Sequence, residues 1–188
     1  MMNVHQWLNI NYLLQGTPSQ VEVYKLLKKH FILEHMQEYN PILVGTVPLG
    51  IHVKDSDLDI ICEVSDFTAF KHRLIERFHT YSDFIITDKV VSGIRRMKAN
   101  FMCEGWPIEI FGQPISTMNQ NGYRHMVIEA RILELYGDSF REQIVGLKRN
   151  GVKTEPAFAQ ALHIDGDPYE RLLELYHWTD EQILGLKR

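Results

Sequence analysis

The feature that most constrains this chain is a pair of aspartates, Asp57 and Asp59, within an aliphatic segment that runs to Cys62. Side chains alternate between two faces of an extended strand, so both aspartates share one face while Leu58 and Ile60 point the other way. Buried carboxylates are costly unless they are paired or bound to a cation, and a divalent ion prefers oxygen ligands. The pair therefore indicates either a metal site or a half-exposed edge strand whose aspartates face water.

A glycine turn upstream favours the metal site. Residues 42–44 form an aliphatic run typical of a short buried strand, and the run ends at Gly45-Thr46. A glycine at this position lets backbone N–H groups approach a ligand closely, and successive N–H groups at such a turn bind anions. With the Thr46 hydroxyl added, the turn is predicted to hold phosphate oxygens beside a metal on the two aspartates.

This combination resembles the DNA polymerase beta-like nucleotidyltransferase superfamily, whose signature is Gly-Ser, a spacer of about ten residues, and Asp-x-Asp in an aliphatic strand. Here residues 47–56 separate Gly45-Thr46 from the first aspartate. The resemblance is closest to the bacterial minimal nucleotidyltransferases, because Gly50 and Ser56 also fall in their register. Two positions depart from that pattern. Thr46 replaces serine but keeps a hydroxyl, whereas Leu49 stands where those proteins often carry arginine, which removes a phosphate or partner contact.

A nucleotidyltransferase needs a third carboxylate on a neighbouring strand, and Glu109 is the candidate. It lies between aliphatic residues in the segment 107–111, and residues 94–103 before it are compatible with a strand. Glu104-Gly105 makes a tight turn, so the two segments are expected to form a hairpin. The alternative is a strand glutamate that faces solvent.

Length and composition favour one domain with an appendage. The 188 residues are 45% hydrophobic, which is enough to bury a core. The sequence has neither a long apolar run nor a signal-peptide pattern, so a cytoplasmic protein without a membrane span is expected. The net charge of −4 gives no general attraction to nucleic acid. Cys62 and Cys103 lack a CxxC spacing and are interpreted as packed thiols.

Helical signals flank the predicted sheet. Residues 1–39 are helical in pattern, with a capping box at Thr17-Pro18-Ser19-Gln20, and residues 66–79 carry apolar side chains at helical spacing. After Gln113 only helix signals recur, including starts at Ser139, Asp167 and Thr179. The sequence thus predicts a mixed α/β fold of the α+β kind. The resemblance implies a nucleotidyltransferase-like mixed β-sheet with helices on one face in residues 1–112, and a helical C-terminal subdomain in residues 113–188.

Several other polar residues are weaker candidates for the site, because each has a simpler explanation. Arg95, Arg96 and Lys98 begin a strand, where Arg96 and Lys98 share a face that either meets a triphosphate or stays solvated. His52 lies in the loop before Asp57, close enough in sequence to contact a phosphate, but is interpreted as a loop residue. Two short polar clusters are interpreted as helix caps or surface residues rather than ligands: Tyr123-Arg124-His125 and Lys153-Thr154-Glu155.

The resemblance implies transfer of a nucleoside monophosphate from a nucleoside triphosphate to an acceptor hydroxyl. Asp57, Asp59 and Glu109 are the implied catalytic and metal-binding residues for Mg²⁺, with Mn²⁺ as an alternative. Gly45, Thr46 and Ser56 are the implied nucleotide-binding residues. Net acidity favours a small molecule or a protein over RNA as the acceptor. Two alternatives stay open: a catalytically silent nucleotide- or metal-binding regulatory module, as in a toxin–antitoxin pair, and a structural domain with solvent-facing aspartates.

Overall fold

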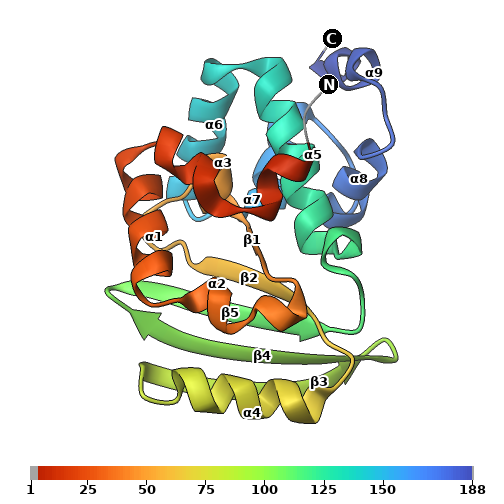
Figure 1. Cartoon of the computed structure of the whole chain (residues 1–188). Helices are drawn as coiled ribbons and strands as arrows, with labels where there is room; N and C mark the ends of the chain where they lie inside the picture. Colours follow the sequence, from red (N-terminus) through yellow and green to blue (C-terminus); the bar gives the residue numbers. More distant parts are fainter. Residues whose placement is uncertain (1–3, 188) are drawn as a thin grey trace.

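The chain folds around one five-stranded mixed sheet, as the computed structural model of residues 4–187 shows (Figure 1). The strand order is β1-β2-β5-β4-β3, with β2 and β5 parallel and the other neighbours antiparallel. The strands are β1 (Ile42–Val44), β2 (Leu58–Glu63), β3 (Ser82–Val91), β4 (Ile94–Cys103) and β5 (Trp106–Gln113). The predicted mixed α/β class and the β4–β5 hairpin are confirmed.

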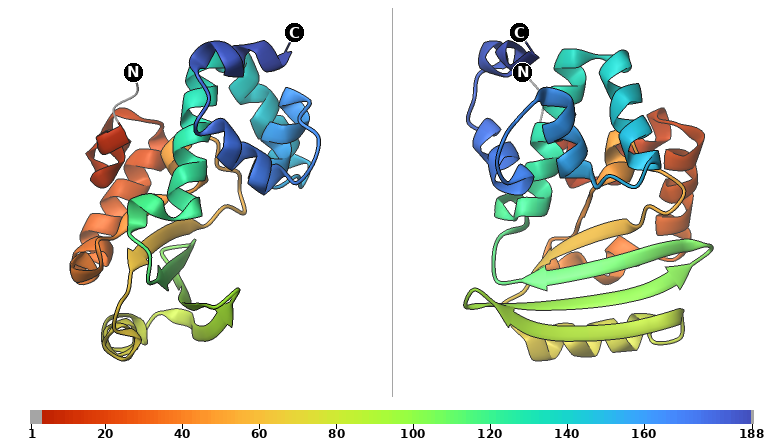
Figure 2. Two further views of the ribbon diagram at one scale, coloured as in Figure 1. Left: turned by 90° about the vertical axis from the view of Figure 1, so that its right-hand side faces the viewer. Right: turned by 180° about the vertical axis from the view of Figure 1, so that it is seen from behind.

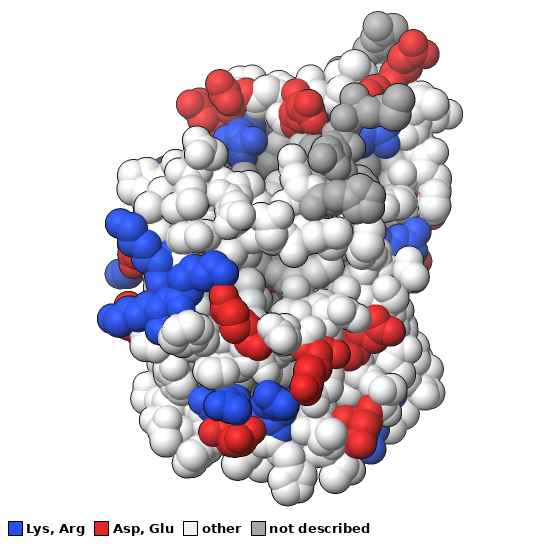
Figure 3. Space-filling view, in the orientation of Figure 1, with Lys and Arg blue, Asp and Glu red and all other residues white. Residues whose placement is uncertain are grey.

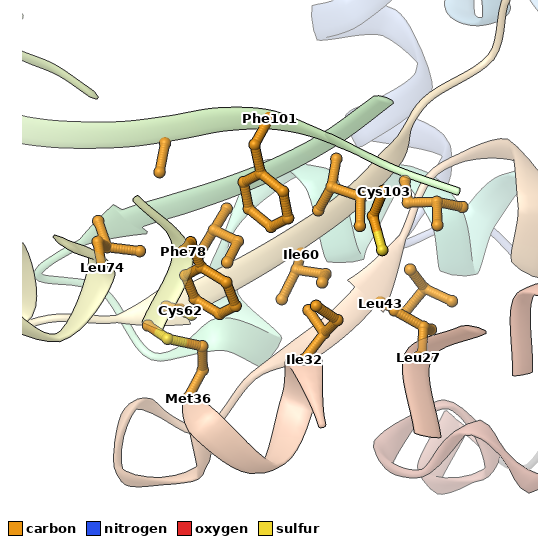
Figure 4. Close-up of a cluster of buried hydrophobic side chains, with 14 of the residues drawn as sticks. Leu27, Ile32, Met36, Leu43, Ile60, Cys62, Leu74, Phe78, Phe101 and Cys103 are labelled. Carbon is orange, nitrogen blue, oxygen red and sulfur yellow. The ribbon is translucent and has the colours of Figure 1, made fainter. Parts of the chain in front are cut away.

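One face of the sheet is covered by helices from the first half of the chain. These are α1 (Pro18–Lys29), α2 (Ile32–His35) and α4 (Phe67–Phe78). Their apolar side chains meet those of β2, β4 and β5 in one buried cluster, in which Phe78 stacks on Phe101 with ring centroids 4.9 Å apart (Figure 4). The thiols of Cys62 and Cys103 are free and buried there, as the sequence predicts. This core fixes the outward direction of Asp59, because Leu58 and Ile60 point into it.

The region after β5 is helical and builds a second cluster against the opposite face at the β1–β2 edge (Figure 2). It contains α5 (Asn121–Tyr136), α6 (Asp138–Arg149), α7 (Thr154–Leu162), α8 (Pro168–Leu175) and α9 (Asp180–Leu184). Ile42, Val44 and Ile61 are the buried residues that the sheet contributes to this cluster. The remaining short elements are α3 (Thr46–Leu49) and the 3₁₀ turns Val4–Leu8, Ile10–Gln15, Gln37–Tyr39, Thr117–Asn119 and Gly185–Lys187. The boundary placed after residue 112 stays a prediction.

Local capping signals explain where four of these helices begin. The Thr17 and Thr179 capping boxes form, and the side chains of Asp66 and Asp167 accept hydrogen bonds from N–H groups of the helices that follow them. The predicted N-cap at Ser139 is wrong by two residues. Gly137, at φ 75°, ends α5 and is also the N-cap of α6, so that helix begins at Asp138. Residues 1–3 of the predicted helical N-terminus lie outside the described residues.

Charges of both signs lie side by side on the face shown in Figure 3. The α1 and α4 helices contribute ion pairs of this kind, including Lys28–Glu34 at 2.6 Å and Arg73–Glu38 at 3.0 Å. Exposed pairs like these add little stability each. Within residues 4–187, no helix has the length and apolar character needed to cross a membrane.

Candidate active site

The register of the sheet brings two of the predicted acids together. Asp59 on β2 is the direct neighbour of Glu109 on the parallel strand β5. Asp57 lies just before β2, two positions from Asp59 and therefore on the same side of the extended chain. All three acids line one cavity of about 850 Å³ between the sheet and the helices α5 to α7. The cavity volume lies in the range typical of small-molecule sites.

Asp59 occupies an electrostatically unfavourable position. Its burial, followed by the charges of Asp57 and Glu109, raises the pKa of Asp59 to about 7, although Lys98 acts in the opposite direction. A carboxylate in this setting is destabilised unless a cation joins it. The position therefore suits a bound cation better than it suits a purely structural residue.

Glu109 is already paired within the protein. The Lys98 ammonium donates to its Oε2 at 2.5 Å, and the Asn100 amide donates to the same oxygen at 3.2 Å. Lys98 is therefore paired within the protein rather than simply solvated, and its contact with a triphosphate stays a prediction. Its neighbour on the same face, Arg96, lines the cavity, and the Arg96 Nε has no hydrogen-bond partner among the described residues.

Gly45 is required by the position of Asp59. Its φ of +84° belongs to the region that favours glycine, and a Cβ there would lie 2.7 Å from the Asp59 Oδ2. The backbone just after β1 thus lies closer to the Asp59 carboxylate than it could if residue 45 carried a side chain. After Gly45 the chain forms the one-turn helix α3 rather than the predicted open turn. Pro48 is compatible with this helix because it lies in the first turn, where its missing N–H removes no intrahelical bond.

Ser56 connects the glycine segment to the aspartates. Its hydroxyl accepts a hydrogen bond from the Val53 N–H at 2.9 Å and one from the Thr46 hydroxyl at 3.4 Å. The loop between α3 and β2 is thereby fixed next to the cavity, which Gly45, Thr46 and Ser56 all line. His52, in the same loop, instead places its ring 6.1 Å from that of Trp106.

The opposite wall of the cavity carries polar residues that sequence reasoning missed or interpreted as surface residues. Glu129 on α5 and Lys148 on α6 were not candidates, and both line the cavity. The Lys148 ammonium donates to the Thr154 hydroxyl at 2.8 Å, and burial lowers the pKa of Lys148. Tyr123 and His125 are buried, so their interpretation as caps or surface residues is wrong. The sequence did contain one signal for a role of Glu129 in the cavity, because Glu129 is a charged residue on an otherwise apolar helix face.

The donor set suits a hard divalent cation. Asp57 and Asp59 offer carboxylate oxygens, and Mg²⁺ is commonly held by one or two carboxylates together with substrate phosphates and water. A complete protein cage is not needed for such an ion. In the part of the chain that the structure describes, no group of three or more His, Cys, Asp or Glu side chains is arranged as a metal site by itself.

The raised pKa of Asp59 predicts a pH-dependent stability in metal-free solution. Between its ordinary value of 3.8 and about 7, the folded protein holds a proton on Asp59 that the unfolded chain has lost. The free energy of unfolding should therefore fall as the pH rises through this window, by at most about 4 kcal/mol. Urea unfolding in EDTA at several pH values measures this, with Asp59→Asn as the comparison. If the free energy of unfolding of that variant falls with pH in the same way, the effect belongs to another group.

Comparisons with known proteins give a family and a fold. The family model "Domain of unknown function (DUF4269)" matches residues 25–175. A comparison with curated proteins finds no match. Among solved structures, one of Cid1, described by its RNA terminal uridylyl transferase activity, is similar with a TM-score of 0.54 and 11% identity, over 85% of this chain and 56% of that one.

Two further structures agree with this likeness. The Cid1 poly(U) polymerase with MgGTP bound has a TM-score of 0.52 and 13% identity, over 78% of this chain and 51% of that one. A cytoplasmic RNA terminal U-transferase has a TM-score of 0.51 and 12% identity, over 87% of this chain and 55% of that one. The chain spans about half the length of these enzymes and shares their fold. The closer resemblance to bacterial minimal nucleotidyltransferases stays a prediction.

Proposed function

We propose that this chain, which belongs to the DUF4269 family, transfers a nucleoside monophosphate from a nucleoside triphosphate to an acceptor hydroxyl. The observation that carries the proposal is the pairing of Asp59 with Glu109 across β2 and β5, directly against the Cβ-free Gly45. Burial and the charges of Asp57 and Glu109 in the same cavity raise the pKa of Asp59, so the arrangement needs a reason beyond stability. The fold shared with terminal uridylyl transferases supports nucleotidyl transfer as that reason.

The proposed roles follow the positions of the side chains. Asp57 and Asp59 would hold Mg²⁺ or Mn²⁺, and Gly45, Thr46 and Ser56 would contact the phosphates. When bound, two such ions would stabilise the attacking and leaving oxygens of an in-line displacement. A bond forms between the acceptor oxygen and the α-phosphorus, the bond from that phosphorus to the bridging oxygen breaks, and pyrophosphate leaves.

Glu109 is proposed to join the metal site or to take the proton of the attacking hydroxyl. The Lys98 ammonium, 2.5 Å from its Oε2, places a positive charge beside the carboxylate before any substrate binds. This ion pair also favours the second candidate function, a silent nucleotide- or metal-binding module, because the Glu109 carboxylate already has a partner within the protein. Label transfer by the wild-type protein distinguishes the two candidates.

The acceptor is proposed to be a small molecule or a protein rather than RNA, in a cytoplasmic setting. Two of the structural relatives are described as acting on RNA, but this chain covers only 56% and 55% of their lengths. The net charge of −4 gives no general attraction to a polyanion. The 850 Å³ cavity suits a nucleotide with a small acceptor.

Nucleotide binding should depend on divalent metal. Asp57, Asp59 and a triphosphate repel one another until cations neutralise them, so Mg²⁺ should tighten binding of a non-hydrolysable ATP or GTP analogue by about a hundredfold or more. Calorimetry in Mg²⁺ and in EDTA measures this. Equal affinity in EDTA would mean that basic residues such as Arg96 hold the phosphates and that the aspartates do not bind metal.

A further inference from the structure

The cavity wall opposite the aspartates contains a buried acid with one unpaired oxygen. Glu129 on α5 is 3% exposed and lines the cavity, and its Oε1 has no hydrogen-bond partner among residues 4–187. Leaving a buried carboxylate oxygen unpaired is unfavourable in the free protein. Neither the metals nor the phosphates need this residue in the proposed reaction, since their proposed ligands lie on the sheet side.

A second acid, Glu155 on α7, lines the same wall beside His125. The His125 Nε2 lies 2.9 Å from the Tyr169 carbonyl oxygen, which only accepts hydrogen bonds, so the proton is on Nε2. The other ring nitrogen, Nδ1, faces the Glu155 Oε1 at 3.5 Å. Burial raises the pKa of Glu129, and the charge of the nearby Glu155 adds to this effect.

Of the two lysines that line this wall, Lys153 is exposed, whereas Lys148 acts on the buried Glu129. Lys148 also interacts with Glu155, Asp57 and Asp59, and its ammonium donates to the Thr154 hydroxyl. Burial favours the protonated form of Glu129, and a cation bound beside it would favour the ionised carboxylate. If Lys148 turns toward a phosphate, that cation must come from elsewhere. A positively charged ligand group would complete the wall, whereas an anionic acceptor would be repelled.

We propose that Glu129 and Glu155 bind a protonated amino group, so that the acceptor is a small amine that also carries the reacting hydroxyl. This inference rests on the proposed nucleotidyl transfer and names the class of its second substrate. The amine would bind at the α5–α7 wall while its hydroxyl faces Asp57 and Asp59 on the sheet side. Neutralising the amine, for example by acetylation, removes the charge that the two glutamates recognise.

The test compares amines with their acetylated forms. Ethanolamine and D-glucosamine are each measured against the N-acetylated compound by calorimetry, with the protein saturated with Mg²⁺ and a non-hydrolysable nucleotide. At least one amine is expected to bind about tenfold or more tightly than its acetylated form, and Glu129→Gln with Glu155→Gln should remove that preference. Glu134→Gln is the matched control, because Glu134 is an exposed residue on the same helix α5. Glu155→Gln alone replaces the double variant if the change at buried Glu129 prevents folding.

The outcomes separate this inference from the proposed function. No amine preference in the wild-type protein, or an unchanged preference in the glutamine variants, would overturn the amine subsite. Nucleotidyl transfer itself is judged separately, by release of pyrophosphate from Mg²⁺-nucleotide with water as the acceptor and by its loss in Asp57→Asn with Asp59→Asn. In that aspartate variant the amine preference should persist, because the glutamates lie on the other wall.

Discussion

Replacing Asp57 and Asp59 together by asparagine is expected to reduce transfer of label from an α-labelled nucleoside triphosphate by at least about a thousandfold. Asparagine keeps the size of the side chain and much of its hydrogen bonding, but it removes the charges that would hold the metal ions. The loss should therefore appear in turnover and in metal-dependent nucleotide binding together. Label transfer by thin-layer chromatography and calorimetry with Mg²⁺ measure the two quantities.

The same double variant should fold normally. Removing two like charges relieves repulsion around Asp59, whose pKa is raised by burial and by its acidic neighbours. The melting temperature of the metal-free protein should stay level or rise, as expected where a site is strained for its function. Asp165→Asn is the matched control, because Asp165 is exposed and is not one of the residues that line the cavity. Wild-type transfer rates in the double variant would rule out the catalytic assignment, and failure to fold would make the aspartates structural.

A single methyl group at Gly45 is expected to damage both the fold and the site. Gly45→Ala places a Cβ 2.7 Å from the Asp59 Oδ2 and imposes a side chain at φ +84°. The backbone strain alone is unfavourable by about 1–2 kcal/mol, and the carboxylate must move away from the glycine segment. Transfer should fall by about a hundredfold or more, because small displacements of catalytic groups have effects of this size.

Gly93→Ala supplies the control for this prediction. Gly93 has a similar φ of +78°, but a Cβ there meets nothing within 4 Å. Its substitution should lower stability through backbone strain while transfer stays near the wild-type rate. If both variants lose stability and keep activity equally, the contact between Gly45 and Asp59 has no functional role. Urea unfolding and label transfer on both proteins decide this.

The local parts of the site were predictable from sequence because they depend on short-range rules. Strand alternation assigns Asp57 and Asp59 to one side, and a glycine before them marks a close backbone approach. The capping boxes at Thr17 and Thr179 were equally readable, since a helix start depends on only a few consecutive residues. The fold class followed from these local patterns and from the family resemblance.

The remaining parts of the site depend on contacts between distant segments. The register that sets Asp59 beside Glu109 requires β5 to insert between β2 and β4, which no local pattern specifies. The ion pair of Lys98 with Glu109 follows from that register, so Lys98 alone looked like a solvated or phosphate-binding residue. Glu129 and Lys148 reach the cavity only because α5 and α6 pack across from the sheet. Helical periodicity says which residues share a face but not what that face meets.

The most direct test is a crystal structure with Mn²⁺ and a non-hydrolysable nucleoside triphosphate, in which anomalous scattering locates the metal. The account predicts Mn²⁺ within about 2.2 Å of carboxylate oxygens of Asp57 and Asp59, with the triphosphate between these residues and the Gly45-Thr46 segment. Whether Glu109 leaves Lys98 to join the metal would be visible in the same map. Metal and phosphates bound elsewhere, with both aspartates facing only solvent, would contradict the proposed function.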